Sequence, residues 1–243
     1  MSNDMGSPED CLARYRALRM ERPDCFREPA NSPIVILTDD HDIAAAQAEE
    51  TARRKLNNQL APDVRVGVLA ADPYLGMLTR DAVRFADQSL GVYNRHIGEP
   101  GCVIMPKIGD YFVLIRIFRH GTRDWAWEFP GGRISPGENP DITAVHELEE
   151  EIGAVRPRLQ LLGMVHPYPA FSGACIHLYM ATIEDLGGPQ IAEGIISIDK
   201  VSPTRLLEMV DNGEITDAAV LACILKAQLR GLVPINSRPN HTI

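Results

Sequence analysis

The sequence lacks the features that would place it in a membrane or outside the cell. It has no run of eighteen or more apolar residues, which argues against a membrane-spanning helix. Residues 1–14 are polar and acidic, and so lack the apolar centre of a signal peptide. Its 5 cysteines show neither CxxC nor Cys/His metal spacing, which predicts free thiols in a reducing compartment and no zinc site. We therefore expect a cytoplasmic protein without a membrane partner.

Positive charge is also scarce. The formal net charge is -9, and the arginines form no basic cluster along the 243 residues. Binding to a phosphate backbone needs such clusters, so we expect no nucleic-acid partner. A polyanionic small molecule would also be repelled unless local cations or a metal offset the field.

The segment from Gly132 to Ala154 combines a glycine turn with a capped helix. Asn139 is a good N-cap, Pro140 suits the first helical position, and Gly153 offers a C-terminal stop. These signals predict a helix between them. Apolar residues at helical spacing predict its buried face, namely Ile142, Val145, Leu148 and Ile152.

Acidic residues crowd one turn of this predicted helix. Glu147, Glu150 and Glu151 stand at i, i+3 and i+4, so their carboxylates should lie together. Like charges at this spacing destabilise a helix by about 0.2 to 0.5 kcal/mol per pair, and a hard cation such as Mg²⁺ or Mn²⁺ would remove the repulsion. The alternative is a solvated acidic face, the usual meaning of a charge run. The glycine turn and Glu138 favour the metal site.

Together these residues resemble the Nudix box, G-x5-E-x7-R-E-U-x-E-E-x-G-U, in which U is aliphatic. The matching positions are Gly132, Glu138, Glu147, Leu148, Glu150, Glu151, Gly153 and Ala154. The resemblance implies an α/β (α+β) fold, a helix, sheet, helix sandwich with a mixed sheet. It also implies metal-dependent hydrolysis of a nucleoside diphosphate linked to another group.

One box position departs from the pattern, because His146 stands where the family has arginine. That arginine orients a box glutamate, and a histidine replaces its charged, two-pronged hydrogen bond only in part. His146 precedes Glu150 by four residues and could donate one hydrogen bond to it. Two interpretations stay open: a working enzyme with altered tuning, which the intact glutamates favour, or a Nudix domain used for binding.

The rest of the chain alternates short strands with a few helices. Helices are predicted over 8–22, 40–57, 202–212 and 214–230, and strands over 34–37, 66–69, 74–78, 82–85, 89–93, 102–106, 111–118, 125–129, 159–166, 174–182 and 195–198. We expect three regions. Residues 1–60 form a helical extension of unknown role, 61–106 a β-meander able to serve as a dimerisation sheet, and 107–243 the Nudix domain with its box at 132–154.

Several segments resemble the ADP-ribose pyrophosphatase branch of the family, namely 114–119, 127–132, 169–173 and 213–217. That resemblance implies substrate contacts from Arg116 and Arg119, although one of them could simply cap a surface. Glu128 and Phe171 are added as candidate substrate contacts, Phe171 for stacking on adenine.

The same branch implies further site residues. The carbonyl of Gly131 would join Glu147, Glu150 and Glu151 as a metal ligand. Glu193 is the leading candidate for the general base, and Glu147 is the fallback. Rival acids near Glu193 are Glu184, Asp185 and Asp199.

The predicted substrate is ADP-ribose, cleaved to AMP and ribose 5-phosphate, or a nucleotide sugar. A dinucleotide, coenzyme A or a biosynthetic diphosphate is the alternative within the family, and a non-catalytic nucleotide sensor is the alternative outside enzyme function. By analogy with the branch we expect a homodimer.

Overall fold

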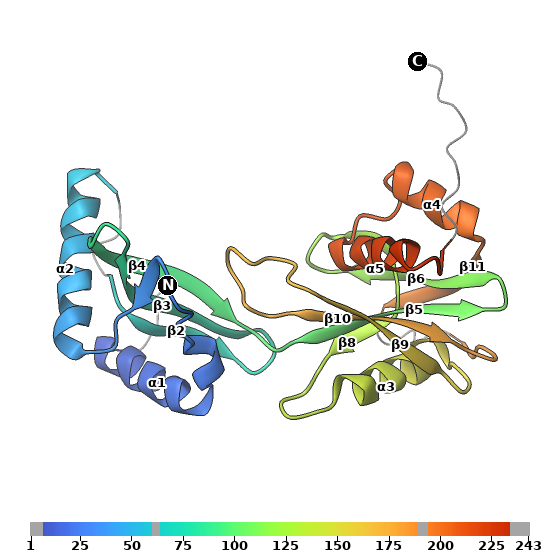
Figure 1. Ribbon diagram of the computed structural model, residues 1–243, viewed down its shortest axis with the longest axis horizontal. Coiled ribbons are helices and arrows are strands. Elements are labelled where there is room, and N and C mark those ends of the chain that lie inside the picture. The colour runs from blue at the N-terminus through green and yellow to red at the C-terminus, as the bar shows by residue number, and fades with distance from the viewer. Residues whose placement is uncertain (1–6, 60–63, 189–193, 234–243) are drawn as a thin grey trace, which may run out of the picture. The chain divides into compact units, whose positions relative to one another are not determined.

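The computed structural model of the chain describes residues 7–59, 64–188 and 194–233 (Figure 1). Internal contacts divide it into two compact units, one made of Met1–Gly98 with Tyr168–Gly173 and the other of Glu99–Pro167 with Ala174–Ile243. Among the residues described, no helix is both long and apolar enough to span a bilayer. All 5 cysteines are free thiols.

A seven-stranded mixed sheet forms the centre of the second unit. Its strands are β5 (Gly101–Ile108), β6 (Tyr111–Arg119), β7 (Asp124–Glu128), β8 (Gly131–Arg133), β9 (Arg158–Val165), β10 (Ile176–Thr182) and β11 (Ile195–Val201). The order is β11-β6-β5-β10-β9, with β7 paired to β6 and β8 paired to β5. Only the β5–β10 pairing is parallel among these strands. The register places Gly131 of β8 opposite Val103 of β5.

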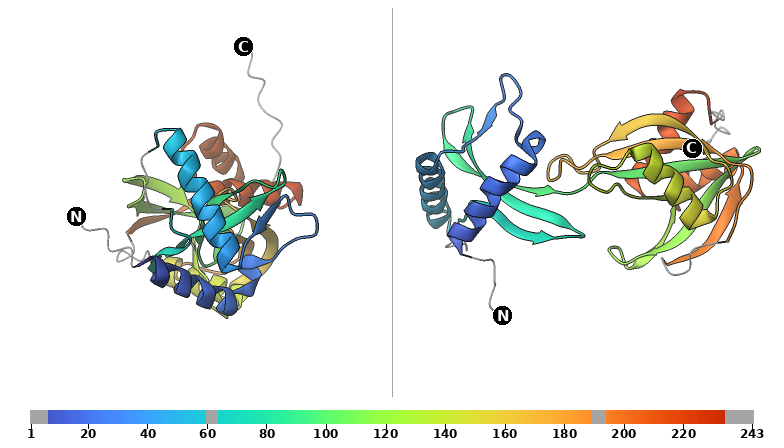
Figure 2. Two further views of the ribbon diagram at one scale, coloured as in Figure 1. Left: turned by 90° about the vertical axis from the view of Figure 1, so that its left-hand side faces the viewer. Right: turned by 90° about the horizontal axis from the view of Figure 1, so that it is seen from below.

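Helices cover both faces of this sheet, which confirms the predicted sandwich. α3 (Pro140–Ile152) lies on one face, and α4 (Pro203–Asp211) and α5 (Ala218–Leu229) lie on the other (Figures 1 and 2). Ala144, Leu148 and Ile152 of α3 pack into the apolar core of the first face. The opposite face buries a second core that includes Leu206 and Val220.

The first unit is a smaller four-stranded sheet with two helices. Its elements are α1 (Pro8–Glu21), the 3₁₀ turn η1 (Pro23–Phe26), β1 (Ile34–Ile36), α2 (Asp40–Leu56), β2 (Gly67–Asp72), β3 (Gly76–Phe85) and β4 (Leu90–Ile97). β3 is central and pairs antiparallel with the other three strands. α1 packs closely against β2. A Cβ added to Gly67 of β2 would lie 2.4 Å from the carbonyl oxygen of Cys11 in α1, so the helix and the strand are in direct backbone contact.

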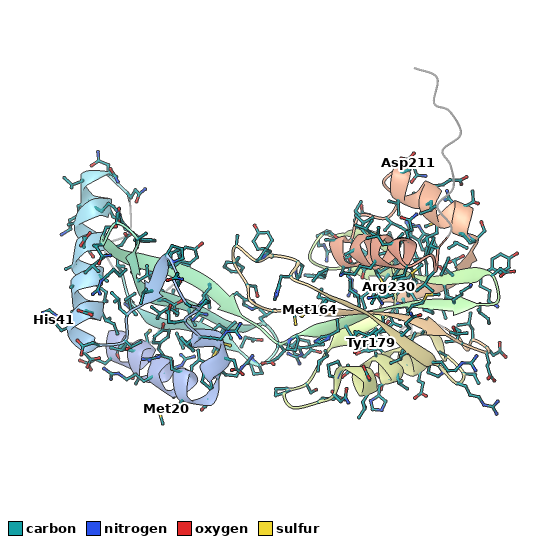
Figure 3. All side chains as sticks on the ribbon, in the orientation of Figure 1. Met20, His41, Met164, Tyr179, Asp211 and Arg230 are labelled. Carbon is teal, nitrogen blue, oxygen red and sulfur yellow. The ribbon has the colours of Figure 1, made fainter. Side chains whose placement is uncertain are left out.

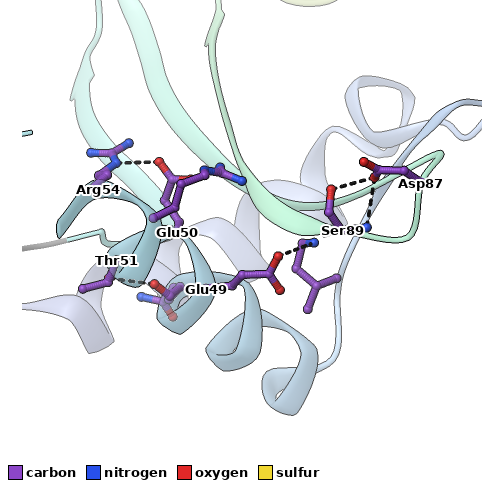
Figure 4. A network of polar contacts seen from close by, with 9 residues as sticks. Glu49, Glu50, Thr51, Arg54, Asp87 and Ser89 are labelled. Carbon is purple, nitrogen blue, oxygen red and sulfur yellow. Dashed lines mark hydrogen bonds and ion pairs between the residues drawn. The ribbon is translucent and has the colours of Figure 1, made fainter. Parts of the chain in front are cut away.

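Polar contacts tie α2 to the β3–β4 hairpin (Figure 4). Glu50 is buried and accepts a hydrogen bond from Arg54 Nε at 2.5 Å. Its neighbour Glu49 accepts the backbone N–H of Leu90, the first residue of β4, at 3.3 Å. The first bond stabilises α2 itself, and the second connects α2 to β4 of the same unit.

The predicted region boundaries differ from these units. The boundary expected between residues 106 and 107 falls inside β5, which belongs to the second sheet. Likewise, the described residues of the extension predicted at 1–60, whose role was left open, pack with β2, β3 and β4 in one unit. Local pattern could not reveal this, because β5 pairs with β10, some 70 residues later in the chain.

Candidate active site

The helix that carries the acidic residues begins and ends as its sequence predicts. The Asn139 side chain accepts the N–H of Asp141 at 2.9 Å, and Gly153 ends the helix in the left-handed conformation with φ of 60°. The predicted buried face is wrong at Ile142, which is 50% exposed, and Val145 is only half-buried. The core contact falls on Ala144 instead, so the buried stripe is rotated toward Ala144, Leu148 and Ile152.

The three carboxylates predicted as metal ligands lie in different environments. Glu151 is buried at 4% exposure, and its Oε2 accepts the backbone N–H of Gly131 at 3.0 Å. Glu147 is half-buried, and Glu150 is exposed. The exposure of the three acids therefore rises from Glu151 through Glu147 to Glu150. Their spacing alone predicted a single shared face.

Two adjacent glycines make room for this arrangement. A Cβ added to Gly132 would lie 1.9 Å from Oε1 of Glu147, so the carboxylate lies directly against the glycine. A Cβ on Gly131 would lie 2.3 Å from the carbonyl oxygen of Cys102 in β5, because β8 and β5 are closely paired. The missing side chain of Gly132 thus leaves space for the Glu147 carboxylate. The missing side chain of Gly131 allows the close pairing of β8 with β5.

Cys102 lies beneath the glycine turn and stays a neutral thiol. Burial raises its pKa to about 11, and the negative charges of Glu147 and Glu151 add to that shift. A thiol with such a pKa is neither a nucleophile nor a metal ligand at neutral pH. Among the described residues of the turn and the helix, the oxygens of the acids and of the Gly131 carbonyl can serve as metal ligands.

His146 does not reach Glu150, the partner expected for it. Its Nδ1 lies 4.0 Å from Oε1 of Glu138, and the imidazole is 59% exposed. The Glu138 carboxylate also accepts the N–H of Ser135 at 3.4 Å. His146 therefore faces the loop before the helix, at a distance from Glu138 too long for a hydrogen bond. Its role in orienting a box glutamate stays a prediction.

The two candidate arginines project from opposite faces of β6, because they are three residues apart on a strand. Arg119 donates two hydrogen bonds to Glu128, from Nε to Oε1 at 2.9 Å and from Nη2 to Oε2 at 2.6 Å. These bonds raise the pKa of Arg119 above its ordinary value, and the charge of Glu151 adds to the effect. Glu128 pairs in register with Ile115, whose side chain lies in the α3-side core. The Arg119–Glu128 pair therefore faces the same side as the acidic helix.

Arg116 lies instead over the ring of Trp127, 4.9 Å from the ring centroid. Trp127 packs against the core beneath α4 and α5. The structure thus separates Arg116 from Arg119 and brings only Arg119 to the α3 side.

The remaining predicted residues lie elsewhere or outside the described ranges. Phe171 belongs to the first unit, where its ring stacks on His96 with centroids 5.8 Å apart. Glu193 lies outside the described residues. Among its rivals, Glu184 accepts a hydrogen bond from Arg156 at 3.1 Å and Asp199 accepts one from Ser197 at 2.7 Å.

The residues of the glycine turn and the helix fit a hard divalent cation. Carboxylate and carbonyl oxygens are the ligands that such ions prefer, and Gly132 leaves space at Glu147 that any side chain would fill. The acids have not closed on one point. Among the described residues, the one acidic or histidine trio whose ligand atoms all lie within 4.8 Å of one another is Asp39, His41 and Asp42, exposed or half-exposed at the start of α2.

One contact at the site was missed by sequence reasoning. Tyr179 of β10 donates a hydrogen bond from its hydroxyl to Oδ1 of Asp141 at 2.7 Å, which connects the sheet to the first turn of α3. Tyr179 lies in the strand predicted over 174–182, and nothing in the pattern of that strand indicated a role at the site. No local signal identifies the partner, because the two residues are 38 positions apart.

Comparisons with known proteins agree with this geometry. The family described as NUDIX domain matches residues 99–220. The ADP-ribose pyrophosphatase of Bacillus subtilis (strain 168) is 24% identical over 139 residues, which are 55% of this chain and 75% of that protein. The ADP-ribose pyrophosphatase of Mycobacterium tuberculosis (strain ATCC 25618 / H37Rv) is 29% identical over 156 residues, 61% of this chain and 74% of that one.

A solved structure has the same fold. The crystal structure of an ADP compounds hydrolase aligns with a TM-score of 0.57 at 22% identity, covering 70% of this chain and 95% of that one. The matched family residues include β5 and all of α3, so the compared region is the one that contains the acids and the glycine turn.

Proposed function

Because the chain belongs to the Nudix family, we propose that it is a metal-dependent pyrophosphohydrolase acting on ADP-ribose or a related nucleotide sugar. The observation that carries the proposal is the contact of the acidic helix with the glycine turn. Glu151 accepts the N–H of Gly131, and Glu147 lies against Gly132. The relatives named ADP-ribose pyrophosphatase support this choice of substrate.

The reaction adds the oxygen of water to one phosphorus and breaks the P–O–P bridge, which turns ADP-ribose into AMP and ribose 5-phosphate. The phosphate oxygens repel an incoming nucleophile, so the site must supply positive charge. A bound divalent cation would supply that charge and lower the pKa of a water ligand. Glu147, Glu150, Glu151 and the Gly131 carbonyl are the groups we assign to hold Mg²⁺ or Mn²⁺.

The other roles follow from the same proposal. Glu193 is the proposed general base, with Glu147 as the fallback, and Arg119 is the proposed phosphate contact on the α3 side. Because Glu128 engages two of its nitrogens, Arg119 would present its remaining nitrogen, Nη1, to a phosphate. Arg116 and Phe171 stay candidate substrate contacts. A homodimer and a cytoplasmic location, which the free thiols support, complete the proposal.

The test is AMP release from ADP-ribose, NADH, diadenosine polyphosphates and nucleotide sugars, each with Mg²⁺ or Mn²⁺. We expect turnover of ADP-ribose or a nucleotide sugar that a Glu150→Gln, Glu151→Gln double variant abolishes. Equal turnover by the double variant would refute the assigned metal site.

A non-catalytic nucleotide sensor is the second candidate, and the observation that favours it is His146 at the arginine position of the box. Calorimetry with ADP-ribose separates the two. Binding without turnover of any substrate, in the presence of either metal, would identify the sensor.

A further inference from the structure

A helix can present metal ligands correctly only if it is fixed along its axis and in rotation. A slip of one residue along α3 would move each carboxylate by about 1.5 Å and turn it by about 100°. The apolar side of α3 packs through Ala144, Leu148 and Ile152, which are fully buried. Apolar packing tolerates rearrangements that conserve volume, so it fixes position less strictly than a directional bond does.

The C-terminal end of α3 is held by backbone contacts. The N–H of Gly187 donates to the carbonyl of Ile152 at 2.9 Å, and a Cβ on Gly153 would lie 2.7 Å from Cα of Gly187. These contacts fix the last turn against the segment after β10. They do not reach the first turn, which buries Thr143.

The N-terminal end is held by the hydroxyl of Tyr179. It donates to Asp141 at 2.7 Å, and Tyr179, which projects from β10 (Figure 3), is only 2% exposed. Burial and the carboxylate of Asp141 raise the pKa of Tyr179 above its ordinary value, so the hydroxyl remains a donor at every physiological pH. Asp141 is also suited to its place, because a negative charge in the first turn is stabilised by the helix dipole.

Asp141 is too far along the helix to bind the metal itself. It precedes Glu147 by six residues and Glu151 by ten, which correspond to about 9 Å and 15 Å along the axis. Any influence of Tyr179 on the metal must therefore pass through the position of the whole helix.

We propose that Tyr179 is a positioning residue for the carboxylates of α3, which it orients through its hydrogen bond to Asp141. The inference rests on the proposed function, because it assumes that Glu147 and Glu151 hold a divalent cation. It predicts that metal affinity depends on a bond formed at the far end of the helix, where no metal ligand lies.

The experiment measures Mn²⁺ affinity of the full-length protein by electron paramagnetic resonance of the free ion. The variants are Tyr179→Phe, which removes only the hydroxyl oxygen, Asp141→Ala, which removes the acceptor at an exposed site, and the double variant. We expect Mn²⁺ to bind about tenfold more weakly to each single variant, at the lower end of what outer partners of metal ligands contribute. The double variant should be no weaker than the singles, because both remove the same bond.

A matched control separates positioning from stability. Ser202→Ala removes the N-cap of α4, where the hydroxyl accepts the N–H of Arg205 at 3.2 Å, and should lower stability by about 1 kcal/mol without changing Mn²⁺ affinity. In turnover, the Tyr179→Phe variant should need more metal for half-maximal rate but reach a similar rate at saturation.

Each outcome decides a separate point. Wild-type Mn²⁺ affinity in both single variants would refute the positioning role, as would additive losses in the double variant. If Glu151→Gln also leaves Mn²⁺ affinity unchanged, the proposed metal site fails as well. If Glu151→Gln abolishes binding while Tyr179→Phe does not alter it, only the inference about Tyr179 is wrong.

Discussion

The two faces of the seven-stranded sheet differ in the types of residue that they bury. The face beneath α4 and α5 buries a core of apolar residues, including Leu206, Val220 and Ile224. The α3 face also has an apolar core, but it buries the carboxylates of Glu128 and Glu151 at its margin. Each buried acid has a hydrogen-bond partner, Arg119 for the first and the Gly131 N–H for the second.

The difference shows where this fold accepts an energetic cost for function. Buried carboxylates are unfavourable unless they are paired, and apolar residues at the same places would stabilise the sheet more simply. Both cores stabilise the sheet, and we propose that the α3 face also provides the chemistry. Variants on the α4–α5 face should change the free energy of unfolding, whereas variants at the acids of the α3 face should change metal affinity and turnover.

The largest expected effect is on the α4–α5 face. Leu206→Ala should lower the free energy of unfolding by about 2 to 5 kcal/mol, because the side chain is fully buried and leaves a cavity. Urea unfolding would measure the loss, and Leu207→Ala, at a half-buried position on the same helix, is the control with a smaller one. The metal concentration for half-maximal activity should stay unchanged, and a shift would contradict the division between the faces.

Substitution of the two glycines sharpens the same comparison. Gly132→Ala should leave the protein folded, because the flexible Glu147 carboxylate can move away from the new methyl group. Metal affinity should fall by roughly 10- to 100-fold, as it does when a group that orients a metal ligand is changed. Gly131→Ala should mainly destabilise the fold, because its methyl group meets backbone. Metal titration and thermal unfolding of both variants would test this. A larger loss of stability in Gly132→Ala, or a larger loss of metal affinity in Gly131→Ala, would contradict these roles of the two glycines.

Loss of the buried ion pair should have a moderate effect. Arg119→Gln removes the partner of the nearly buried Glu128 and should reduce stability by about 1 to 2 kcal/mol, a value lowered for the exposure of the guanidinium. Arg156→Gln breaks an exposed pair with Glu184 and should reduce it by less than about 1 kcal/mol. Denaturant unfolding of the two variants should rank them in this order, and equal losses would show that burial of Glu128 contributes nothing.

The smallest effect is expected from His146→Arg. The imidazole is mostly exposed, and its Nδ1 lies 4.0 Å from Oε1 of Glu138. Arginine at this position could pair with Glu138 in the same way, so metal affinity and turnover should change by less than about threefold. Steady-state kinetics with ADP-ribose would test it. A gain of tenfold or more would show that the box arginine orients a ligand that His146 leaves unsupported.

Much of α3 was predictable because its signals are local. Asn139, Pro140 and Gly153 fixed its ends, and the box spacing placed the acids beside the glycine turn. The rotation of its buried face was not predictable, because Ile142 and Ala144 compete for the core and only the neighbouring strands decide between them.

Pairings between distant segments account for the other differences. The parallel pairing of β5 with β10 moved the boundary between the two units, and no residue near 106 signals it. Tyr179 and Asp141 meet although they are 38 positions apart in the sequence, and the separation of Arg116 from Arg119 needed the register of β6 with β7. Patterns along the chain identified the acids, and contacts across the sheet determined which residues support them.

The most direct test of the account compares two neighbouring acids of α3 in ADP-ribose hydrolysis. Glu151 is buried against Gly131, whereas Glu149 is exposed and has no assigned role. With saturating Mg²⁺, Glu151→Gln should release AMP at least about a hundredfold more slowly than wild type, and Glu149→Gln should match wild type. Equal rates for the two variants, or AMP release by the wild type after complete chelation of metal, would contradict the account.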